Sequence, residues 1–217
     1  MQRFDPRIRL PQLLTRCFSG ALWRLPEDEM KVVLTFDDGP IPEVTPWVLD
    51  LLKKEKIKAC FFCVGENVER YPDVYQRILD EGHQTGNHTF NHLQGLKTSN
   101  GVFFNNIEKA AGYIHSNLFR PPHGWMRKSQ FNELRKYYQV VMWDIISGDY
   151  RQDLTPEIVA QNVLDFVRPG SIITFHDSIK ALGNLTHALP LVIEKLKESG
   201  YQFVRLPQAS KQVKIAI

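Results

Sequence analysis

Short apolar runs alternate with amphipathic segments along most of this 217-residue chain, and this alternation restricts its fold more than any other feature. KVVLTFD at 31–37 is typical of a buried strand that Gly39 and Pro40 bring to an end. Further strands are predicted at 58–65, 139–145, 171–177 and 201–206, and helices at 45–57, 71–82, 100–117, 155–167 and 188–200. This order indicates an α/β fold with a parallel sheet covered on both faces. Chemistry in such folds gathers at the carboxyl ends of the strands.

The composition is that of a single globular domain. Hydrophobic residues make up 43% of the chain and charged residues 24%, so a sizeable core can form. The net charge of +3 comes without a dense stripe of Lys and Arg, which argues against a nucleic-acid partner. No apolar run reaches the roughly 18 residues that a membrane-spanning helix needs, so no transmembrane segment is predicted. Three cysteines do not make a disulfide framework, and Cys60 and Cys63 are interpreted as buried thiols in a core strand.

Residues 1–30 precede the alternating pattern and are predicted to extend the domain of residues 31–217. Apolar residues recur at helical spacing from Leu10 to Leu22, and arginines at positions 3, 7 and 9 give this stretch a basic edge. We expect an amphipathic helix that packs on the domain. The alternative is a helix on the inner membrane surface, with contact through residues 8–24. Because no signal-peptide cleavage site is recognisable, the chain is predicted to be cytoplasmic, with the inner face of the membrane as the alternative location.

Two carboxylates stand side by side in TFDDGP (35–40), where the first strand ends. Like charges at this distance repel each other, so Asp37 and Asp38 favour a nearby cation over a purely structural role. NHTFNH (87–92) places His88 and His92 four residues apart, on one face of a predicted helical turn where both imidazoles can share one ion. Two histidines and a strand-end carboxylate are a standard ligand set for catalytic zinc, with one position open for water.

Three further motifs are ambiguous when each is taken alone. FRPPHG (119–124) holds Arg120 beside two prolines, a pattern that an ordinary surface turn also shows. MWDIISGDY (142–150) contains Asp144 and Asp149, and either acid is compatible with a turn. TFHD (174–177) places His176 at the end of a predicted strand, where core and turn histidines are also common.

Taken in order, TFDDGP, HTFNH, RPPHG, the Trp-Asp strand end and TFHD resemble the motifs of the polysaccharide deacetylase family, also called NodB-like or carbohydrate esterase family 4. The similarity extends over 31–206 and makes 31–217 a NodB-like domain. It implies a distorted, incompletely closed (β/α) barrel with about seven parallel strands. It also implies metal-dependent removal of acetyl groups from an N-acetylated amino sugar of a cell-envelope glycan or its precursor. The alternatives are hydrolysis of a non-sugar C–N bond on the same fold and a catalytically silent glycan-binding module.

The resemblance carries a metal site onto three positions of this chain. Asp38, His88 and His92 are implied as the ligands, with Zn²⁺ favoured by this donor set. Co²⁺, Ni²⁺ and Mn²⁺ remain alternatives, because the same nitrogen and oxygen donors accept them.

The resemblance also implies two proton-transfer pairs. Asp37 is implied as the general base, oriented by Arg120, and His176 as the general acid, oriented by Asp149. Ile146 stands where many relatives have an acid, which leaves Asp149 as the first candidate for tuning the pKa of His176. Asp144 is the second. Three aromatic side chains are expected to contact the substrate: His123, Trp125 and Tyr150. His123 and Tyr150 replace the Tyr and Trp that many relatives have there.

Overall fold

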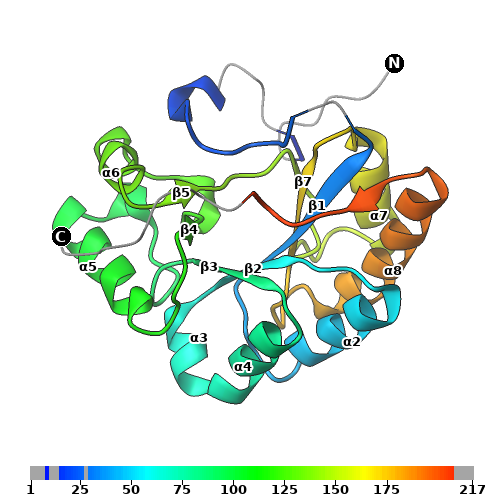
Figure 1. The fold of residues 1–217 in the computed structure, drawn as a ribbon, viewed down its shortest axis with the longest axis horizontal. Helices are drawn as coiled ribbons and strands as arrows, with labels where there is room; N and C mark the ends of the chain where they lie inside the picture. The colour runs from blue at the N-terminus through cyan, green and yellow to red at the C-terminus, as the bar shows by residue number, and fades with distance from the viewer. Residues whose placement is uncertain (1–7, 10–14, 27–28, 208–217) are drawn as a thin grey trace.

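A curled sheet of parallel strands forms the centre of the computed structural model, which describes residues 8–9, 15–26 and 29–207. The strand order is β5-β4-β3-β2-β1-β7-β6, and β8 pairs with the start of β1 (Figure 1). The strands are β1 (Lys31–Asp37), β2 (Cys60–Cys63), β3 (Gln84–Asn87), β4 (Leu118–Phe119), β5 (Gln139–Val140), β6 (Ile145–Ile146), β7 (Ile172–His176) and β8 (Gln202–Phe203). Seven parallel strands in a curled half-barrel confirm the predicted fold class.

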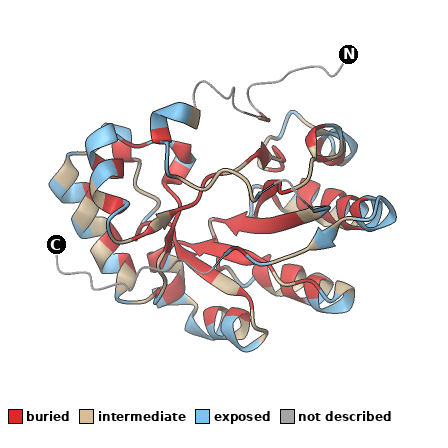
Figure 2. Ribbon diagram, turned by 45° about the horizontal axis from the view of Figure 1, so that its top comes forward, coloured by how far each residue is buried: buried red, intermediate tan, exposed pale blue. Residues whose placement is uncertain are grey.

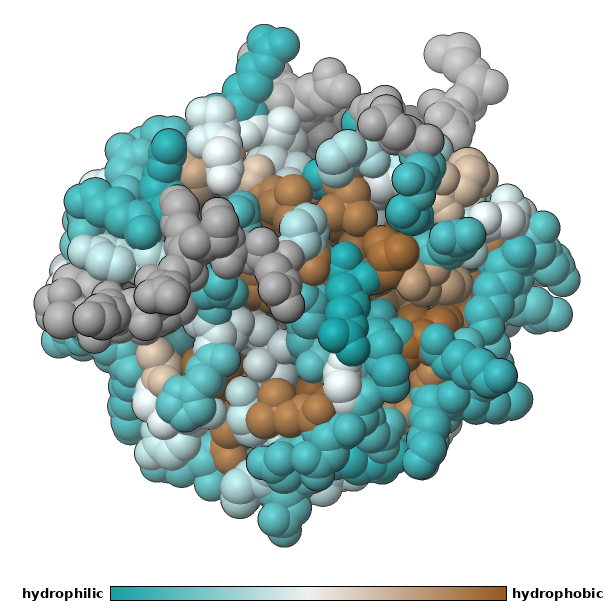
Figure 3. Space-filling view, in the orientation of Figure 1, coloured by the Kyte–Doolittle hydropathy of each residue, from teal (hydrophilic) through white to brown (hydrophobic). Residues whose placement is uncertain are grey.

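Helices surround this sheet. They are α2 (Thr45–Glu55), α3 (Gly65–Arg70), α4 (Pro72–Asp80), α5 (Asn100–Ala111), α6 (Lys128–Leu134), α7 (Pro156–Phe166) and α8 (Leu182–Glu198), with short 3-10 turns η1 (Arg16–Phe18), η2 (Gly95–Lys97) and η3 (Pro122–Gly124). Figure 2 shows buried strands at the centre and exposed outer helix faces. Figure 3 shows the same division, with hydrophilic side chains over the helices and apolar ones toward the middle of the face.

The strand that carries the two acids runs through the main core. All of β1 except Lys31 is buried, as the continuous apolar run predicts. β1 pairs with β7 in a register that sets Asp37 opposite His176, so the two strand-end motifs meet at one edge. Cys60 and Cys63 are buried, unpaired thiols of β2, which confirms their interpretation as core residues.

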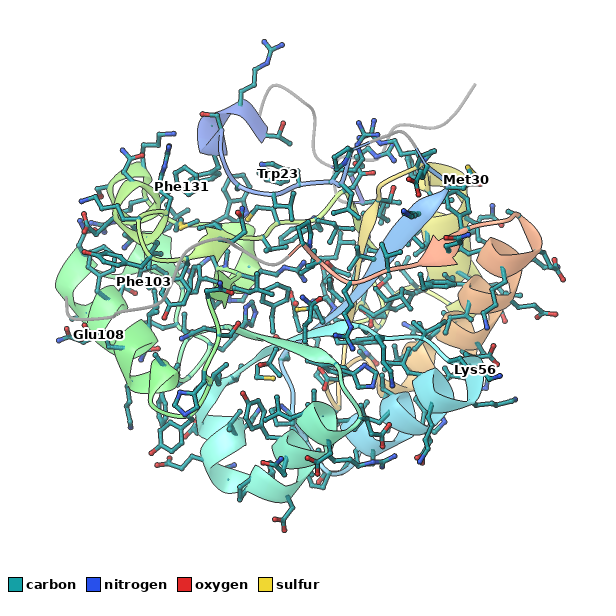
Figure 4. All side chains as sticks on the ribbon, in the orientation of Figure 1. Trp23, Met30, Lys56, Phe103, Glu108 and Phe131 are labelled. Carbon is teal, nitrogen blue, oxygen red and sulfur yellow. The ribbon has the colours of Figure 1, made fainter. Side chains whose placement is uncertain are left out.

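The N-terminal segment closes the open side of the barrel. Leu22 forms a parallel bridge with Val141, next to β5, and Arg24 forms an antiparallel bridge with Ser171, next to β7. The segment therefore runs across from the β5 side of the sheet to the β7 side (Figure 1). Phe18, Ala21 and Trp23 of this segment join a core cluster that also contains Phe103 and Phe131 (Figure 4).

The predicted amphipathic helix is wrong over residues 19–22, which form a turn and isolated bridges, whereas Thr15 and η1 are helical. Residues 10–14 of the prediction lie outside the described residues. An unclosed sheet presents backbone donors and acceptors at its edges, and an extended segment can pair with them where a helix cannot. Leu22 makes both kinds of bond, donating its N–H to Val140 O and accepting from Met142 N–H at 2.8 Å each. None of the helices in the described ranges is long and apolar enough to cross a membrane.

The predicted strand at 139–145 is two short strands. β5 ends at Val140 and β6 starts at Ile145, and the residues between them pair first with Leu22 and then with Ile172. The sequence from 139 to 145 is largely apolar because the connecting residues 141–144 cross the core from β5 at one edge of the sheet to β6 at the other. The sequence did not predict β3 or β4, since β3 is polar and β4 has two residues.

Helix ends differ from prediction where packing outweighs local signals. α8 begins at Leu182, six residues before the predicted start, and contains Pro190. Its buried face continues on both sides of that proline, from Leu185 to Leu196, and this packing outweighs the missing backbone donor. α5 ends at Ala111, short of the predicted 117, because the chain turns into β4.

Candidate active site

The two adjacent acids after β1 serve different partners because the backbone turns between them. Asp37 is the last residue of β1 and is buried, whereas Asp38 has a positive φ of 84°. This left-handed conformation lets neighbouring carboxylates point to different groups. Asp37 Oδ1 accepts from Arg120 Nη1 at 2.6 Å, and Asp38 Oδ1 lies 3.2 Å from His92 Nε2.

Arg120 is fully buried and is no surface-turn residue. Its guanidinium lies over the Phe62 ring at 4.1 Å, and its other donors reach oxygens on neighbouring strands. These acceptors are Thr35 Oγ1, Val141 O and Met142 O. Because all three guanidinium nitrogens donate hydrogen bonds, Arg120 fixes Asp37 in one position.

His88 and His92 come together in a loop, so the predicted helical turn is wrong. The chain between them is irregular, and Thr89 and His92 have positive φ angles of 66° and 58°. Asn87 Oδ1 accepts from Thr89 N–H and stabilises this turn. His88 Nδ1 is 2.7 Å from Arg120 O, so this nitrogen donates and Nε2 is left facing Asp38, 3.8 Å away.

These three residues fit a transition-metal ion. One donor atom from each of Asp38, His88 and His92 lies within 4.8 Å of the other two. Burial lowers the pKa of His88 to about 4, so its imidazole is neutral and keeps a lone pair for a metal. Burial raises the pKa of Asp38, but electrostatic interaction with the surrounding histidines, His176 foremost, outweighs burial and lowers the pKa overall. The bond from His88 to a backbone carbonyl fixes the tautomer in the way metal-binding histidines require.

His176 and Asp149 form a second buried pair. Asp149 Oδ1 lies 2.8 Å from His176 Nδ1, and Oδ2 accepts from the backbone N–H of His176 at 2.7 Å. Burial acts to lower the pKa of His176, but the charge and hydrogen bond of Asp149, with smaller contributions from the charges of Asp38 and Asp37, outweigh burial and raise this pKa to about 9. The imidazole is therefore protonated at neutral pH, as a general acid must be. Tyr150 lies edge-on to the ring, with centroids 4.9 Å apart.

Asp144, the second candidate for tuning His176, belongs to a different cluster. Arg168 binds it in a two-pronged ion pair at 2.6 and 3.0 Å, and Ser171 Oγ donates to it at 2.7 Å. Arg9 from the N-terminal segment lies 3.3 Å from the same carboxylate. Asp144 thus ties the N-terminal segment and the start of β7 together.

Replacing Asp144 with asparagine is expected to lower the free energy of unfolding by about 2 kcal/mol, since the buried end of an ion pair is lost. The loss is smaller than for a fully buried pair because the Arg168 side chain is 33% exposed and can be solvated. Urea titration of the wild type and the variant measures it. A variant as stable as the wild type would contradict this structural role for Asp144.

All these motifs line one cleft of about 630 Å³. Its described lining comprises Asp37, Asp38, His88, His92, His123, Gly124, Trp125, Trp143, Ile146, Tyr150, His176, Ser178 and Lys180. The three aromatic residues that the sequence assigned to the substrate are all in this lining. His123 has a φ of 59° and meets the His92 ring edge-on at 4.6 Å, while Trp125 is 41% exposed.

Sequence reasoning missed three lining residues. Trp143 lies in the MWDII run, next to Asp144, and lines the cleft. Its ring fills the space that a side chain on residue 124 would need, so Gly124 allows this packing. Ser178 and Lys180 follow the TFHD motif in a segment without a recognisable pattern. Their position directly after a strand end was the available signal.

Comparisons with known proteins agree with these motifs. The family profile described as Polysaccharide deacetylase matches residues 24–141. A peptidoglycan-N-acetylglucosamine deacetylase of Bacillus cereus is 36% identical over 91% of this chain and 74% of its own length. The Bacillus subtilis peptidoglycan-N-acetylmuramic acid deacetylase PdaC is 34% identical over 82% of this chain and 38% of its own length.

A solved structure is similar over nearly the whole chain. It is a peptidoglycan N-acetylglucosamine deacetylase in complex with 4-naphthalen-1-yl-N-oxidanyl-benzamide. Its TM-score is 0.86 at 31% identity, and the alignment covers 93% of this chain and 99% of that one. With the profile, the relatives and the fold in agreement, this chain belongs to the polysaccharide deacetylase family, carbohydrate esterase family 4.

Proposed function

We propose that this protein hydrolyses the N-acetyl groups of peptidoglycan amino sugars with the help of a divalent metal ion. The observation that carries the proposal is one cleft that joins a metal-type donor set to two separate proton-transfer pairs. Asp37 is held by Arg120 and His176 by Asp149. The substrate class rests on the relatives, whose names specify peptidoglycan N-acetylglucosamine or N-acetylmuramic acid.

Asp38, His88 and His92 would hold the metal ion. When bound, such an ion supplies Lewis acidity, which polarises the acetyl carbonyl and makes water a better nucleophile. Zn²⁺ suits one carboxylate and two imidazoles, and Co²⁺, Ni²⁺ or Mn²⁺ can use the same donors.

The two pairs divide the proton transfers. Asp37 accepts a proton from the attacking water, while the bond to Arg120 keeps its carboxylate aimed into the cleft. His176 holds the proton that the departing nitrogen needs and delivers it as the C–N bond breaks. The products are acetate and a free amino sugar. Before this transfer, the Asp149 carboxylate stabilises the protonated form of His176.

The shape of the cleft favours a glycan over a small cyclic amide. Trp125, Trp143 and Tyr150 line its walls, and flat aromatic faces suit sugar rings. Trp125 remains 41% exposed, as expected of a wall that an extended substrate passes. The silent glycan-binding module is disfavoured because Asp37, Arg120 and His176 are all present and paired.

Acetate release tests this proposal. Peptidoglycan fragments, chitooligosaccharides and N-acetylglucosaminyl lipid precursors would be incubated with chelator-treated protein and with the same protein after zinc is restored. We expect release from the peptidoglycan fragments only when metal is present. Zinc binding without acetate release from any of these glycans would support the silent module, unless the zinc-loaded protein opens the ring of a cyclic amide, which would support the amidase.

Lys180 provides a finer test of the substrate class. Among the described residues no carboxylate pairs with its ammonium group, although the lysine lines the cleft. Muramic acid units carry a carboxylate that such a cation can attract. Lys180→Gln is therefore expected to lower kcat/KM for peptidoglycan fragments about two- to fivefold, the range of exposed ion pairs, with neutral chitooligosaccharides as the matched control. An equal loss on both substrates would exclude charge recognition.

A further inference from the structure

Asp177 is a buried carboxylate that the proposed mechanism does not use. It follows His176 directly and is only 1% exposed. Asp177 Oδ1 accepts from the backbone N–H of Gly39 at 3.1 Å, and Oδ2 accepts from Thr45 Oγ1 at 2.6 Å. Both oxygens thus reach the turn that follows the paired acids, on the neighbouring strand.

The turn from Gly39 to Thr45 is built around this carboxylate. Thr45 is fully buried, and its Oγ1 also accepts from Ile41 N–H at 2.9 Å. A β-carbon on Gly39 would lie 1.9 Å from Asp177 Oδ2, so only glycine allows the close approach. The backbone N–H of Asp177 donates to Asp37 O at 3.1 Å and ties the two strand ends together.

Other residues hold this turn from the opposite side. Asn67 Nδ2 donates to Asp38 O at 2.7 Å, and Val64 N–H donates to Gly39 O at 2.8 Å. Asp38 therefore sits between anchors on β7 and anchors at the start of α3. Its positive φ needs such support, because a non-glycine residue adopts that conformation only when its surroundings impose it.

We infer that Asp177 is a positioning residue for the metal site: through Gly39 and Thr45 it sets the turn that aims Asp38 at His88 and His92. The inference rests on the proposed function only in taking those three residues as metal ligands. Asp177 would not contact the metal itself and would act through the backbone of the turn that follows Asp38. It also couples the strand that carries the acid, His176, to the strand that carries the base, Asp37.

Zinc affinity and acetate release of three variants test this inference. Asp177→Asn keeps an oxygen that can accept from Gly39 N–H, but it places an amide NH₂ where Oδ2 accepts from the Thr45 hydroxyl. Thr45→Val removes the hydroxyl while keeping the shape, and Thr45→Ser restores the hydroxyl. We expect Asp177→Asn to raise the Kd for zinc about 10- to 100-fold, the usual effect of losing support behind a ligand. Thr45→Val should raise it in the same direction, and Thr45→Ser should stay close to the wild type.

Asp144→Asn is the matched control, because it also removes one buried, hydrogen-bonded carboxylate but lies in a different cluster. It should lower stability and leave the Kd for zinc unchanged. If Asp177→Asn and Thr45→Val lower the melting temperature of the metal-free protein yet bind zinc within twofold of the wild type, the role is structural and the inference is wrong. Should Asp177→Asn not fold, the comparison of Thr45→Val with Thr45→Ser decides.

The zinc titration separates this inference from the proposed function. A wild type that binds zinc but releases no acetate from any glycan would overturn the proposed function. The positioning role would still be judged by the Kd values of the variants.

Discussion

Replacing Asp37 with asparagine is expected to lower kcat for acetate release by about 10²–10⁴-fold while zinc binding is retained. Asparagine has the same shape, and its Oδ1 can still accept the hydrogen bond from Arg120 that the carboxylate accepts at 2.6 Å. It cannot take a proton from water at neutral pH. The variant therefore removes the proposed base and leaves its position intact. Single-turnover release of acetate from a peptidoglycan fragment, measured with zinc present, gives the loss.

Asp38→Asn is the matched comparison, because it makes the same carboxylate-to-amide change at the next residue. That carboxylate faces His88 and His92 instead of Arg120, so zinc affinity should fall as well as activity. The two neighbouring substitutions should thus separate metal binding from proton transfer. If Asp37→Asn releases zinc, Asp37 is itself a ligand. If it retains more than a tenth of wild-type kcat, the base is another group.

The part of the site at the ends of β1 and β7 could be predicted from the sequence, because TFDDGP and TFHD end strands that the apolar runs predict. In a parallel sheet, the carboxyl ends of all strands meet at one edge, so residues far apart in the chain converge there. Asp37 and His176 are an example, since they are register partners on β1 and β7. The order of the motifs then carried the family resemblance. Most of the positions it assigned line one cleft, and Arg120 and Asp149 are buried behind Asp37 and His176.

Local geometry at the ligands could not be predicted in this way. The spacing of His88 and His92 is helical, yet the pair meets because two residues of the loop adopt positive φ angles. Such angles depend on side-chain support that sequence periodicity does not report. Here Asn87 accepts from Thr89 N–H, and its own Nδ2 is held by Ile107 O of α5. The positive φ at Asp38 is a second example, and it explains how adjacent acids avoid sharing one environment.

The N-terminal segment shows a different limit. Its apolar residues recur at helical spacing, but from Ala21 to Arg24 the chain runs across the opening of the barrel and forms strand-like bridges. An incompletely closed sheet leaves backbone groups at its edges that need partners, and this demand comes from the whole fold. The local pattern placed Phe18 in the core correctly and gave the wrong backbone conformation for residues 19–22. The predicted boundary at residue 30 and the cytoplasmic location stay predictions.

The alkaline limb of the pH–rate profile is expected to move to lower pH when Asp149 is replaced by asparagine. His176 must be protonated to act as an acid, so activity falls as pH rises through its pKa, which Asp149 raises to about 9. Without that charge, burial is less opposed and the pKa drops, by about one to three units for a lost neighbouring carboxylate. A shift of about two units would lower kcat about tenfold at pH 8, where the wild-type acid is still protonated.

Asp144→Asn again supplies the control, because Asp144 was the other candidate for tuning the acid and lies with Arg168 and Ser171 instead. The alkaline limb of the Asp144→Asn profile should lie at the same pH as that of the wild type.

Asp149→Asn should also change how the free energy of unfolding depends on pH. The wild-type pair stabilises the fold most where His176 is charged in both folded and unfolded chains, below about pH 6.5. Because the folded pKa is the higher one, that contribution fades between there and about pH 9. Urea titrations at pH 6 and pH 9.5 should therefore differ less in Asp149→Asn than in the wild type. An unmoved alkaline limb would mean that His176 is tuned by another group or is not the acid.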